Sequence, residues 1–285
     1  MAQKRLTKRQ LEIRNKWILS GILVFIGFGI YLLIRMSIAA YEERMEDKRA
    51  TVKWTYQQAK ARQLKASPVI SNGVVWSKAD GDDIDRYMKP DRFYHHSEQR
   101  YQFLNLKLSQ KIDADTLNEL LEDRGILEGL GKAFARASKK EDVNEIYLIS
   151  HAMLETGKGT SELAQGVTLN KEGQRDKKGR RYYNFFGIGA YDQNPVMDGA
   201  RFAQKQGWDS PEKAVRGGAA FIHREYLSRD SQYTLYSMRF NPADPGRHQY
   251  ATDVMWATHN ARQMAQYYKQ LGLEGKFFTR HYYQK

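Results

Sequence analysis

The stretch NEIYLISHAMLETGKGTSELA, from Asn144 to Ala164, joins a strongly apolar segment to a carboxylate and a glycine-containing turn. Tyr147, His151 and Glu155 recur every four residues, so they share one face of a predicted helix. Gly157 is typical of a residue at which a helix stops. The stretch therefore predicts a buried helix that carries Glu155 in its last turn.

Glu155 has the position expected of a proton donor. The negative end of the helix dipole disfavours a carboxylate there, and a pocket that excludes water would do the same. Both effects favour the neutral acid, which can protonate a leaving oxygen near neutral pH, as cleavage of a glycosidic bond requires. The alternative is an ordinary carboxylate at a helix end. His151 would either orient Glu155 or serve only in packing.

Composition excludes a disordered chain and gives the protein a basic character. The 285 residues are 41% hydrophobic, which suits one sizeable domain with attachments. The net charge is +13, and residues 1–16 contribute six basic side chains against one acidic, or +5 of that total. Such a charge suits nucleic acid, acidic lipid or an anionic polymer, and because we find no nucleic-acid-binding module, an anionic cell envelope fits better. The absence of cysteine excludes disulfides and thiolate metal sites.

An uncharged run, Trp17 to Ile34, follows the basic residues 1–16 and predicts a membrane helix over residues 17–40. The positive-inside bias places residues 1–16 in the cytoplasm and the long C-terminal part outside the cell. The alternative is a cleaved signal peptide, since Ser37-Ile38-Ala39 resembles a cleavage site. Glycines within the helix would permit contact with an integral membrane protein, although their spacing is not GxxxG.

The part that follows divides into three segments by composition. Residues 41–66 are charged and poor in large apolar side chains, and we expect an exposed helical stalk that reaches about 40 Å. Residues 67–100 contain proline and glycine and should form an irregular arm packed on the domain. Residues 101–285 form the main domain. His95 and His96 have no partners at metal-ligand spacing, so we expect no metal site.

Within residues 101–285 the pattern predicts short helices with one small β lobe. Asp113 or Asp115 can cap a helix, and Ser210-Pro211 opens another. Between the helices, Gly166 to Tyr183 has β-favouring ends and a polar middle, which is typical of a hairpin. The fold class is therefore mostly α (α+β).

Three motifs resemble those of the bacterial endo-β-N-acetylglucosaminidases of glycoside hydrolase family 73. They are LETGKGTSELAQG from Leu154, YYNFFGIGA from Tyr182 and YATD from Tyr250, and the similarity runs from about Tyr101 to the C-terminal region. The resemblance implies a lysozyme-like helical fold, with a small β-hairpin lobe beside the cleft, that cleaves peptidoglycan after N-acetylglucosamine. It also implies that Glu155 is the general acid and that neither a metal nor an organic cofactor is needed.

The sequence does not identify the second catalytic group. Glycoside hydrolysis ordinarily uses two carboxylates, about 5 to 5.5 Å apart for retention or about 6.5 to 9.5 Å apart for inversion. Glu172 or Asp176, in the hairpin, is our candidate for the second carboxylate, with Glu162 as a further alternative. If the acetamide of the substrate acts as nucleophile instead, Tyr250 would stabilise it.

The resemblance places the YYNFFGIGA strip along the saccharide groove. The predicted substrate-binding residues are Tyr183, Asn184, Phe185, Phe186, Gly187 and Asp253. The alternatives are a core position for one of the two phenylalanines and a helix cap for Asp253.

Together these features predict a single-pass membrane protein whose external domain hydrolyses the GlcNAc-β-1,4-MurNAc bond of peptidoglycan. Its tether favours newly made glycan strands near the membrane as substrate. The alternatives are a lytic transglycosylase of related fold, which forms an anhydro sugar, and a non-catalytic wall-binding scaffold.

Overall fold

The computed structural model describes residues 8–45, 47–71, 73–190, 193–229 and 231–285. The chain divides into two compact units, residues 1–46 and residues 47–285. Each unit is described by itself below.

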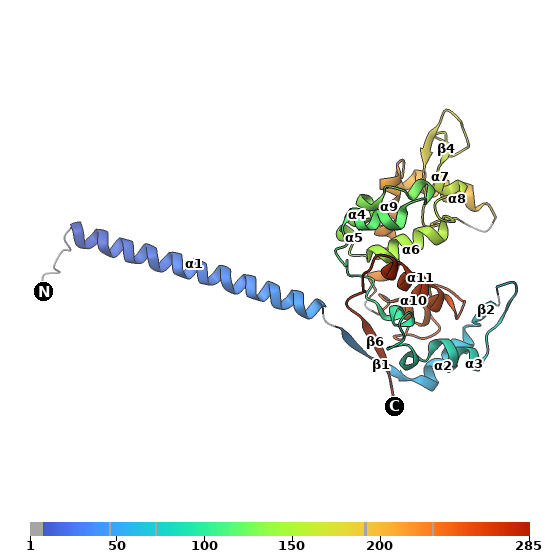
Figure 1. Cartoon of the computed structure of the whole chain (residues 1–285), viewed down its shortest axis with the longest axis horizontal. Helices are drawn as coiled ribbons and strands as arrows, with labels where there is room; N and C mark the ends of the chain where they lie inside the picture. Colours follow the sequence, from blue (N-terminus) through green and yellow to red (C-terminus); the bar gives the residue numbers. More distant parts are fainter. Residues whose placement is uncertain (1–7, 46, 72, 191–192, 230) are drawn as a thin grey trace. The chain divides into compact units, whose positions relative to one another are not determined.

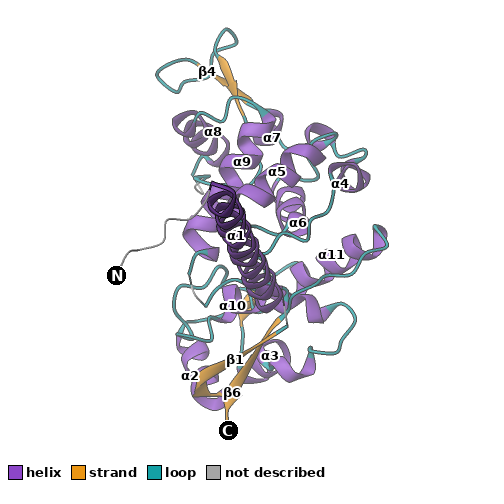
Figure 2. Ribbon diagram, turned by 90° about the vertical axis from the view of Figure 1, so that its left-hand side faces the viewer, coloured by secondary structure: helices purple, strands orange, loops and turns teal. Residues whose placement is uncertain are grey.

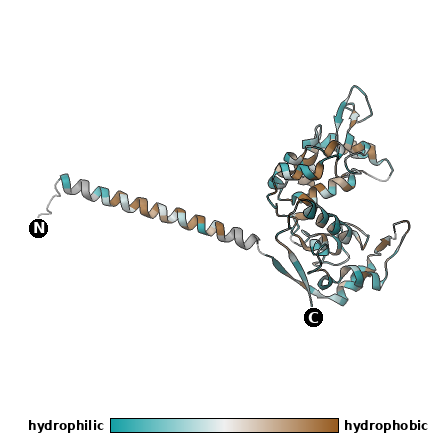
Figure 3. Cartoon of the chain, viewed as in Figure 1, coloured by the Kyte–Doolittle hydropathy of each residue, from teal (hydrophilic) through white to brown (hydrophobic). Residues whose placement is uncertain are grey.

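The first unit contains one helix, α1 (Lys8–Met45). Its segment Asn15–Ile38 is long and apolar enough to cross a membrane, and none of it is buried against protein. Figure 3 shows hydrophobic residues recurring along the middle of this helix. A membrane anchor and a signal sequence both have this character.

The second unit is built mainly from helices (Figures 1 and 2). They are α2 (Tyr56–Lys65), α3 (Gly81–Met88), α4 (Ala114–Leu121), α5 (Gly131–Glu141), α6 (Glu145–Glu155), α7 (Glu162–Gln165), α8 (Pro195–Gln206), α9 (Pro211–Ile222), α10 (Leu235–Phe240) and α11 (Trp256–Gln270). Shorter 3₁₀ turns lie at η1 (Pro90–Arg92), η2 (Gln99–Phe103) and η3 (Gly125–Leu127), and a π-helical turn, η4 (His223–Leu227), extends α9. The mostly helical class predicted from the sequence is confirmed.

The helix α6 forms the centre of this unit. Every residue from Glu145 to Met153 is buried, and only Leu154 and Glu155 at its end are exposed. The Asn144 side chain caps the helix by accepting a hydrogen bond from the Tyr147 amide at 2.9 Å. A helix that is apolar on all sides must be surrounded by others, so α6 can present only its C-terminal end to solvent.

Three two-stranded sheets accompany the helices. β4 (Val167–Leu169) pairs antiparallel with β5 (Arg180–Tyr182), which gives the predicted hairpin. β2 (Val69–Ser71) pairs antiparallel with β3 (Trp76–Lys78). β1 (Lys48–Thr55) pairs parallel with β6 (Thr279–Gln284), so the beginning and end of the second unit lie side by side.

Residues 48–66 contradict the exposed helical stalk that we expected over residues 41–66. Besides β1, this segment forms α2, whose Ala59 and Gln63 are fully buried. Gln63 donates a hydrogen bond to the Phe240 carbonyl at 2.7 Å. Alanine and glutamine can line a close helix contact without large apolar side chains, and for that reason composition alone missed the packing.

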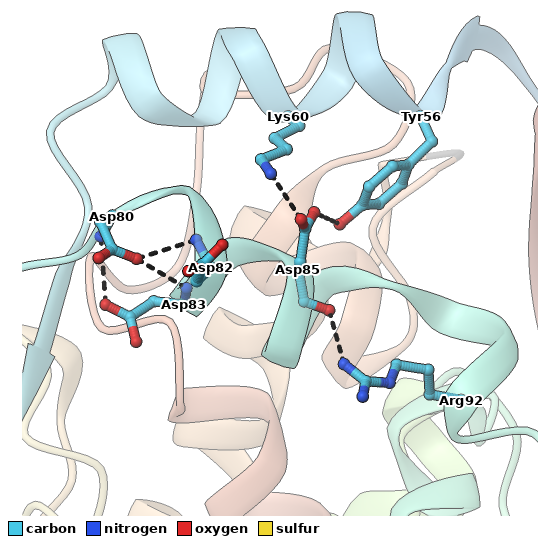
Figure 4. Close-up of polar contacts among 7 residues, drawn as sticks. All are labelled: Tyr56, Lys60, Asp80, Asp82, Asp83, Asp85 and Arg92. Carbon is cyan, nitrogen blue, oxygen red and sulfur yellow. Dashed lines mark hydrogen bonds and ion pairs between the residues drawn. The ribbon is translucent and has the colours of Figure 1, made fainter.

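The contact between α2 and α3 is polar (Figure 4). The carboxylate of Asp85 accepts hydrogen bonds from Lys60 at 2.6 Å and from the Tyr56 hydroxyl at 2.8 Å. Asp80 caps α3 through its contacts with the amides of Asp82 and Asp83. Residues 67–100 are thereby joined to the segment that precedes them.

Candidate active site

Glu155 lies at the C-terminal end of α6, where the buried helix meets solvent. Its side chain is 38% exposed, and partial burial raises the pKa of its carboxyl group. Desolvation favours the neutral acid because a charge loses hydration on burial. Partial burial thus shifts the carboxyl group toward the protonated form that a general acid needs.

His151 and Tyr250 extend from Glu155 into the protein. Nε2 of His151 lies 3.7 Å from Oε1 of Glu155 and 3.1 Å from the Tyr250 hydroxyl, so one ring nitrogen faces both groups. The Tyr250 ring in turn packs against Tyr226 and Trp256, at centroid distances of 4.8 and 4.7 Å. These aromatic contacts fix the hydroxyl beside His151.

The ring of His151 is enclosed by aromatic side chains. Tyr147, Phe186 and Tyr250 meet it edge to face at centroid distances of 5.7, 5.7 and 5.9 Å. Burial lowers the pKa of His151 to about 4, so the ring is neutral at neutral pH. The 3.7 Å contact between His151 and Glu155 is therefore not an ion pair. The neutral imidazole does not favour the ionised form of Glu155.

Gly187 is in direct contact with the carboxyl group of Glu155. Its φ is +63°, and a Cβ atom added there would lie 2.7 Å from Oε2 of Glu155. Both the backbone angle and the close approach require glycine. Gly187 is one of the predicted substrate-binding residues, and the structure brings it beside the predicted acid.

The other residues of the YYNFFGIGA strip divide between core and surface. Phe185 and Phe186 are both buried and belong to the core, whereas we expected a core position for one of them. Asn184 is also buried and donates hydrogen bonds to the carbonyls of Ile188 and Gly199 at 2.8 and 3.2 Å. Its amide group shapes the turn before Gly187 and does not fit the predicted contact with substrate. Tyr183 is half-buried.

Asp253 has a local structural role. Its carboxylate accepts a hydrogen bond from the Met255 amide at 2.9 Å, immediately before α11. Its carbonyl accepts one from Nε of the buried Arg239 at 2.6 Å. Asp253 does not cap α11, because the residue at the N-cap is Met255 and it makes no side-chain cap hydrogen bond. The contact with the Met255 amide is a local turn, and the Asp253 side chain is half-buried.

Glu172 and Asp176 lie in the loop between β4 and β5, which extends beyond the helices in both views (Figures 1 and 2). Both line a hollow of about 670 Å³ together with Lys171, Lys178 and Arg180. Among the described contacts, none joins either carboxylate to Glu155. Glu162, the further alternative, pairs with Arg175 at 2.5 Å and ties the loop to α7.

Sequence reasoning underestimated His151. Its spacing of four residues from Glu155 was visible, but a buried histidine is more often a packing residue. The decisive signal, the approach of Tyr250 from a segment far along the chain, appears only in the folded structure.

The chain is similar to known proteins both in sequence and in structure. The sequence profile of the glucosaminidase family, described as mannosyl-glycoprotein endo-beta-N-acetylglucosaminidase, matches residues 131–269. The solved structure of Staphylococcus aureus glucosaminidase B is 43% identical with a TM-score of 0.74, and the match covers 85% of this chain and 95% of that one. S. aureus autolysin E, solved with the muropeptide NAM-L-Ala-D-iGlu, is 37% identical with a TM-score of 0.65, covering 82% and 98%.

The curated relatives are much longer proteins. The bifunctional autolysin of Staphylococcus epidermidis is 47% identical over 216 residues, which cover 75% of this chain. The aligned region is 16% of the length of that autolysin.

The raised pKa of Glu155 predicts a stability change in Glu155→Gln. The folded state binds more protons than the unfolded state above the ordinary glutamate pKa of about 4.3, so stability falls as pH rises through this window. Glutamine cannot ionise, so the variant lacks the free-energy cost of desolvating a carboxylate at this position. The variant should therefore melt at a higher temperature than the wild type at pH 7, and the difference should vanish near pH 3. Thermal unfolding followed by circular dichroism measures both.

Glu128→Gln is the control because Glu128 is exposed outside this site, and it should leave the melting temperature unchanged at both pH values. A Glu155→Gln variant that melts below the wild type at pH 7 would show that the ionised carboxylate stabilises the fold.

Proposed function

The chain belongs to the endo-β-N-acetylglucosaminidase family of glycoside hydrolases, family 73, and we propose on that premise that it hydrolyses the GlcNAc-β-1,4-MurNAc bond of peptidoglycan. The observation that carries the proposal is the partly buried Glu155, held between neutral His151 and Gly187. Autolysin E, a relative, has been solved with a muropeptide and, as a catalytic glutamate-to-alanine mutant, with the disaccharide NAG-NAM, which supports the substrate class.

Glu155 acts as the general acid. Its carboxyl group donates a proton to the glycosidic oxygen, and the bond to the anomeric carbon breaks as positive charge develops on the sugar. Burial raises the pKa of this carboxyl group and so favours its protonated form, while its exposed edge lets the oxygen approach. Gly187 leaves room for the carboxyl group because it has no side chain.

His151 positions Glu155 and keeps it neutral. A protonated imidazole 3.7 Å from the carboxyl group would favour its ionised form. The aromatic enclosure prevents this by keeping the ring neutral, and the Tyr250 hydroxyl holds Nε2 in place. His151 thus links the acid to Tyr250.

The group that completes the reaction is Glu172, Asp176 or the acetamide of the substrate with Tyr250 as stabiliser. The loop that carries the two carboxylates would have to approach Glu155 when substrate binds. The acetamide route needs no such movement, and the short path from Tyr250 through His151 to Glu155 favours it. Tyr183 is the aromatic residue that we propose to contact the sugar, and Asp253 supports the segment that carries Tyr250.

Glu155→Gln should lose glycan cleavage by at least about a hundredfold, since general acid catalysis typically contributes 10² to 10⁴. Wild-type digests should carry N-acetylglucosamine at the new reducing ends, seen as N-acetylglucosaminitol by mass spectrometry after borohydride reduction. Reduced muramic acid would move the cleavage to the other bond, and anhydro ends would identify a transglycosylase. Near-normal cleavage by a folded Glu155→Gln would remove this residue from its role.

Three variants separate the routes to the second group. If a hairpin carboxylate takes part, either Glu172→Gln or Asp176→Asn should lower kcat far more than it raises KM. If the acetamide is the nucleophile, both should lose little, and Tyr250→Phe should be severely impaired although its aromatic packing is kept. Steady-state kinetics on soluble glycan measures all three. Full activity in every variant would exclude all three groups.

We also propose that α1 anchors the enzyme in the membrane, with residues 1–16 in the cytoplasm and the catalytic unit outside. The support is the apolar segment Asn15–Ile38 behind a basic terminus. Its lipid-facing surface and glycines leave room for an integral membrane partner, because a Cβ atom added at Gly21 or Gly27 would meet nothing within 4 Å.

Such an anchor would confine the enzyme to nascent glycan strands. The second unit begins at Asp47, so residues 39–46 can span at most about 28 Å even when fully extended. This span is shorter than the reach of about 40 Å that we expected for a helical stalk over residues 41–66. Tethering raises the effective concentration of substrate within that reach and excludes substrate beyond it.

Replacing residues 1–46 by a cleavable export signal should therefore abolish control of the length of new strands, although the enzyme stays active. Chromatography of pulse-labelled glycan, at equal protein level, measures strand length. Normal lengths in these cells would show that α1 serves only for export.

A further inference from the structure

A basic groove lies between α5 and α9, outside the site described above. It is a hollow of about 540 Å³. Three of its cationic side chains come from α5, namely Lys132, Arg136 and Lys140, and two from α9, Lys213 and Arg216. Glu212 is the acidic side chain of the lining. The groove shares no lining residue with the surroundings of Glu155.

The cations of the groove are arranged in a row. Lys132, Arg136 and Lys140 follow one another at intervals of four residues, so they form a stripe along α5 with steps of about 6 Å. The side chains of the five cationic residues are all exposed. Lys213 pairs with Asp209 at 2.5 Å and Lys140 approaches Glu141 at 3.6 Å. In the described part of the chain, no ion pair involves Lys132, Arg136 or Arg216.

Helix stability explains only part of this arrangement, because it favours Lys140 in the last turn of α5 but not the other cations. Lys132 and Lys213 lie in the first turns of their helices, where the positive end of the dipole disfavours a cation. Like charges four residues apart also repel each other. The two helices therefore accept small costs to gather positive charge in one hollow, and a bound anion would offset those costs.

We propose that the groove binds a linear polyanion of the phosphodiester class, such as an anionic envelope polymer, separately from the glycan that is cleaved. A phosphodiester chain carries its charges on its own backbone, and these can follow the stripe on α5. The planar guanidinium groups of Arg136 and Arg216 can each form paired hydrogen bonds to one phosphate. Because the site is concave, a flexible chain can enter it more readily than the headgroups of a flat bilayer can.

The function of this contact is to hold the catalytic unit on the anionic polymer of the envelope. Binding at a second point keeps the enzyme near its substrate without using the cleft. The proposal does not depend on the bond that Glu155 cleaves.

Binding of fluorescent inorganic polyphosphate to the full-length protein in neutral detergent tests the proposal. The double variant Arg136→Gln/Arg216→Gln should bind at least about tenfold more weakly than the wild type. The slope of log Kd against log salt should fall by about 1 to 1.5, by analogy with single-stranded nucleic acids. The basic residues 1–16 are present in every variant, so their contribution cancels.

The matched control is Arg229→Gln/Arg247→Gln, which removes the same charge from exposed arginines outside the groove. It should change the affinity less than about twofold. Equal losses in the two double variants would overturn the proposal, because the binding would then follow net charge alone. Equal melting temperatures establish that both are folded.

Two further measurements separate this groove from other sites. Cleavage of a short, undecorated glycan should be unchanged in Arg136→Gln/Arg216→Gln. A variant that loses this cleavage but keeps polyphosphate binding would place the groove on the path of the substrate and overturn the proposal. The proposal would also be overturned if Arg136→Gln/Arg216→Gln bound polyphosphate normally but no longer bound anionic lipid vesicles. The ligand of the groove would then be the bilayer.

Discussion

The burial of α6 is the constraint on which the rest of the structure depends. From Glu145 to Met153 the helix is enclosed by the other helices, and only its last two residues reach the surface. The carboxyl group of Glu155 is therefore fixed by a rigid element and is partly removed from water, which raises its pKa. The same packing fixes the position of this carboxyl group and shifts it toward its neutral form.

The polar groups near Glu155 remain neutral because aromatic side chains surround them. Burial lowers the pKa of His151 and raises that of Tyr250, so neither carries a charge at neutral pH. A charged partner would make Glu155 a stable carboxylate and a poor donor. A neutral partner such as His151, 3.7 Å away, can orient the carboxyl group without favouring its ionised form, and this distinguishes the site from a structural ion pair.

The two ends of the second unit are joined by the parallel pairing of β1 and β6. Residues that precede the main domain in the sequence are thus integral to its fold, and Gln63 is buried deeply enough to hydrogen-bond the Phe240 carbonyl. The segment after α1 therefore contributes packing to the second unit.

The sequence by itself determined the helical class, the helix that carries Glu155, the hairpin from Val167 to Tyr182 and the membrane-type segment, because each depends on local periodicity. The tertiary structure decided the rest. Whether Asn184 and Phe185 face substrate or core, and whether residues 48–66 extend into solvent or pack, depends on segments distant in sequence. The approach of Tyr250 to His151 and of Gly187 to Glu155 likewise joins residues far apart along the chain. Such contacts leave no periodic signal, because side-chain packing is set by the fold as a whole.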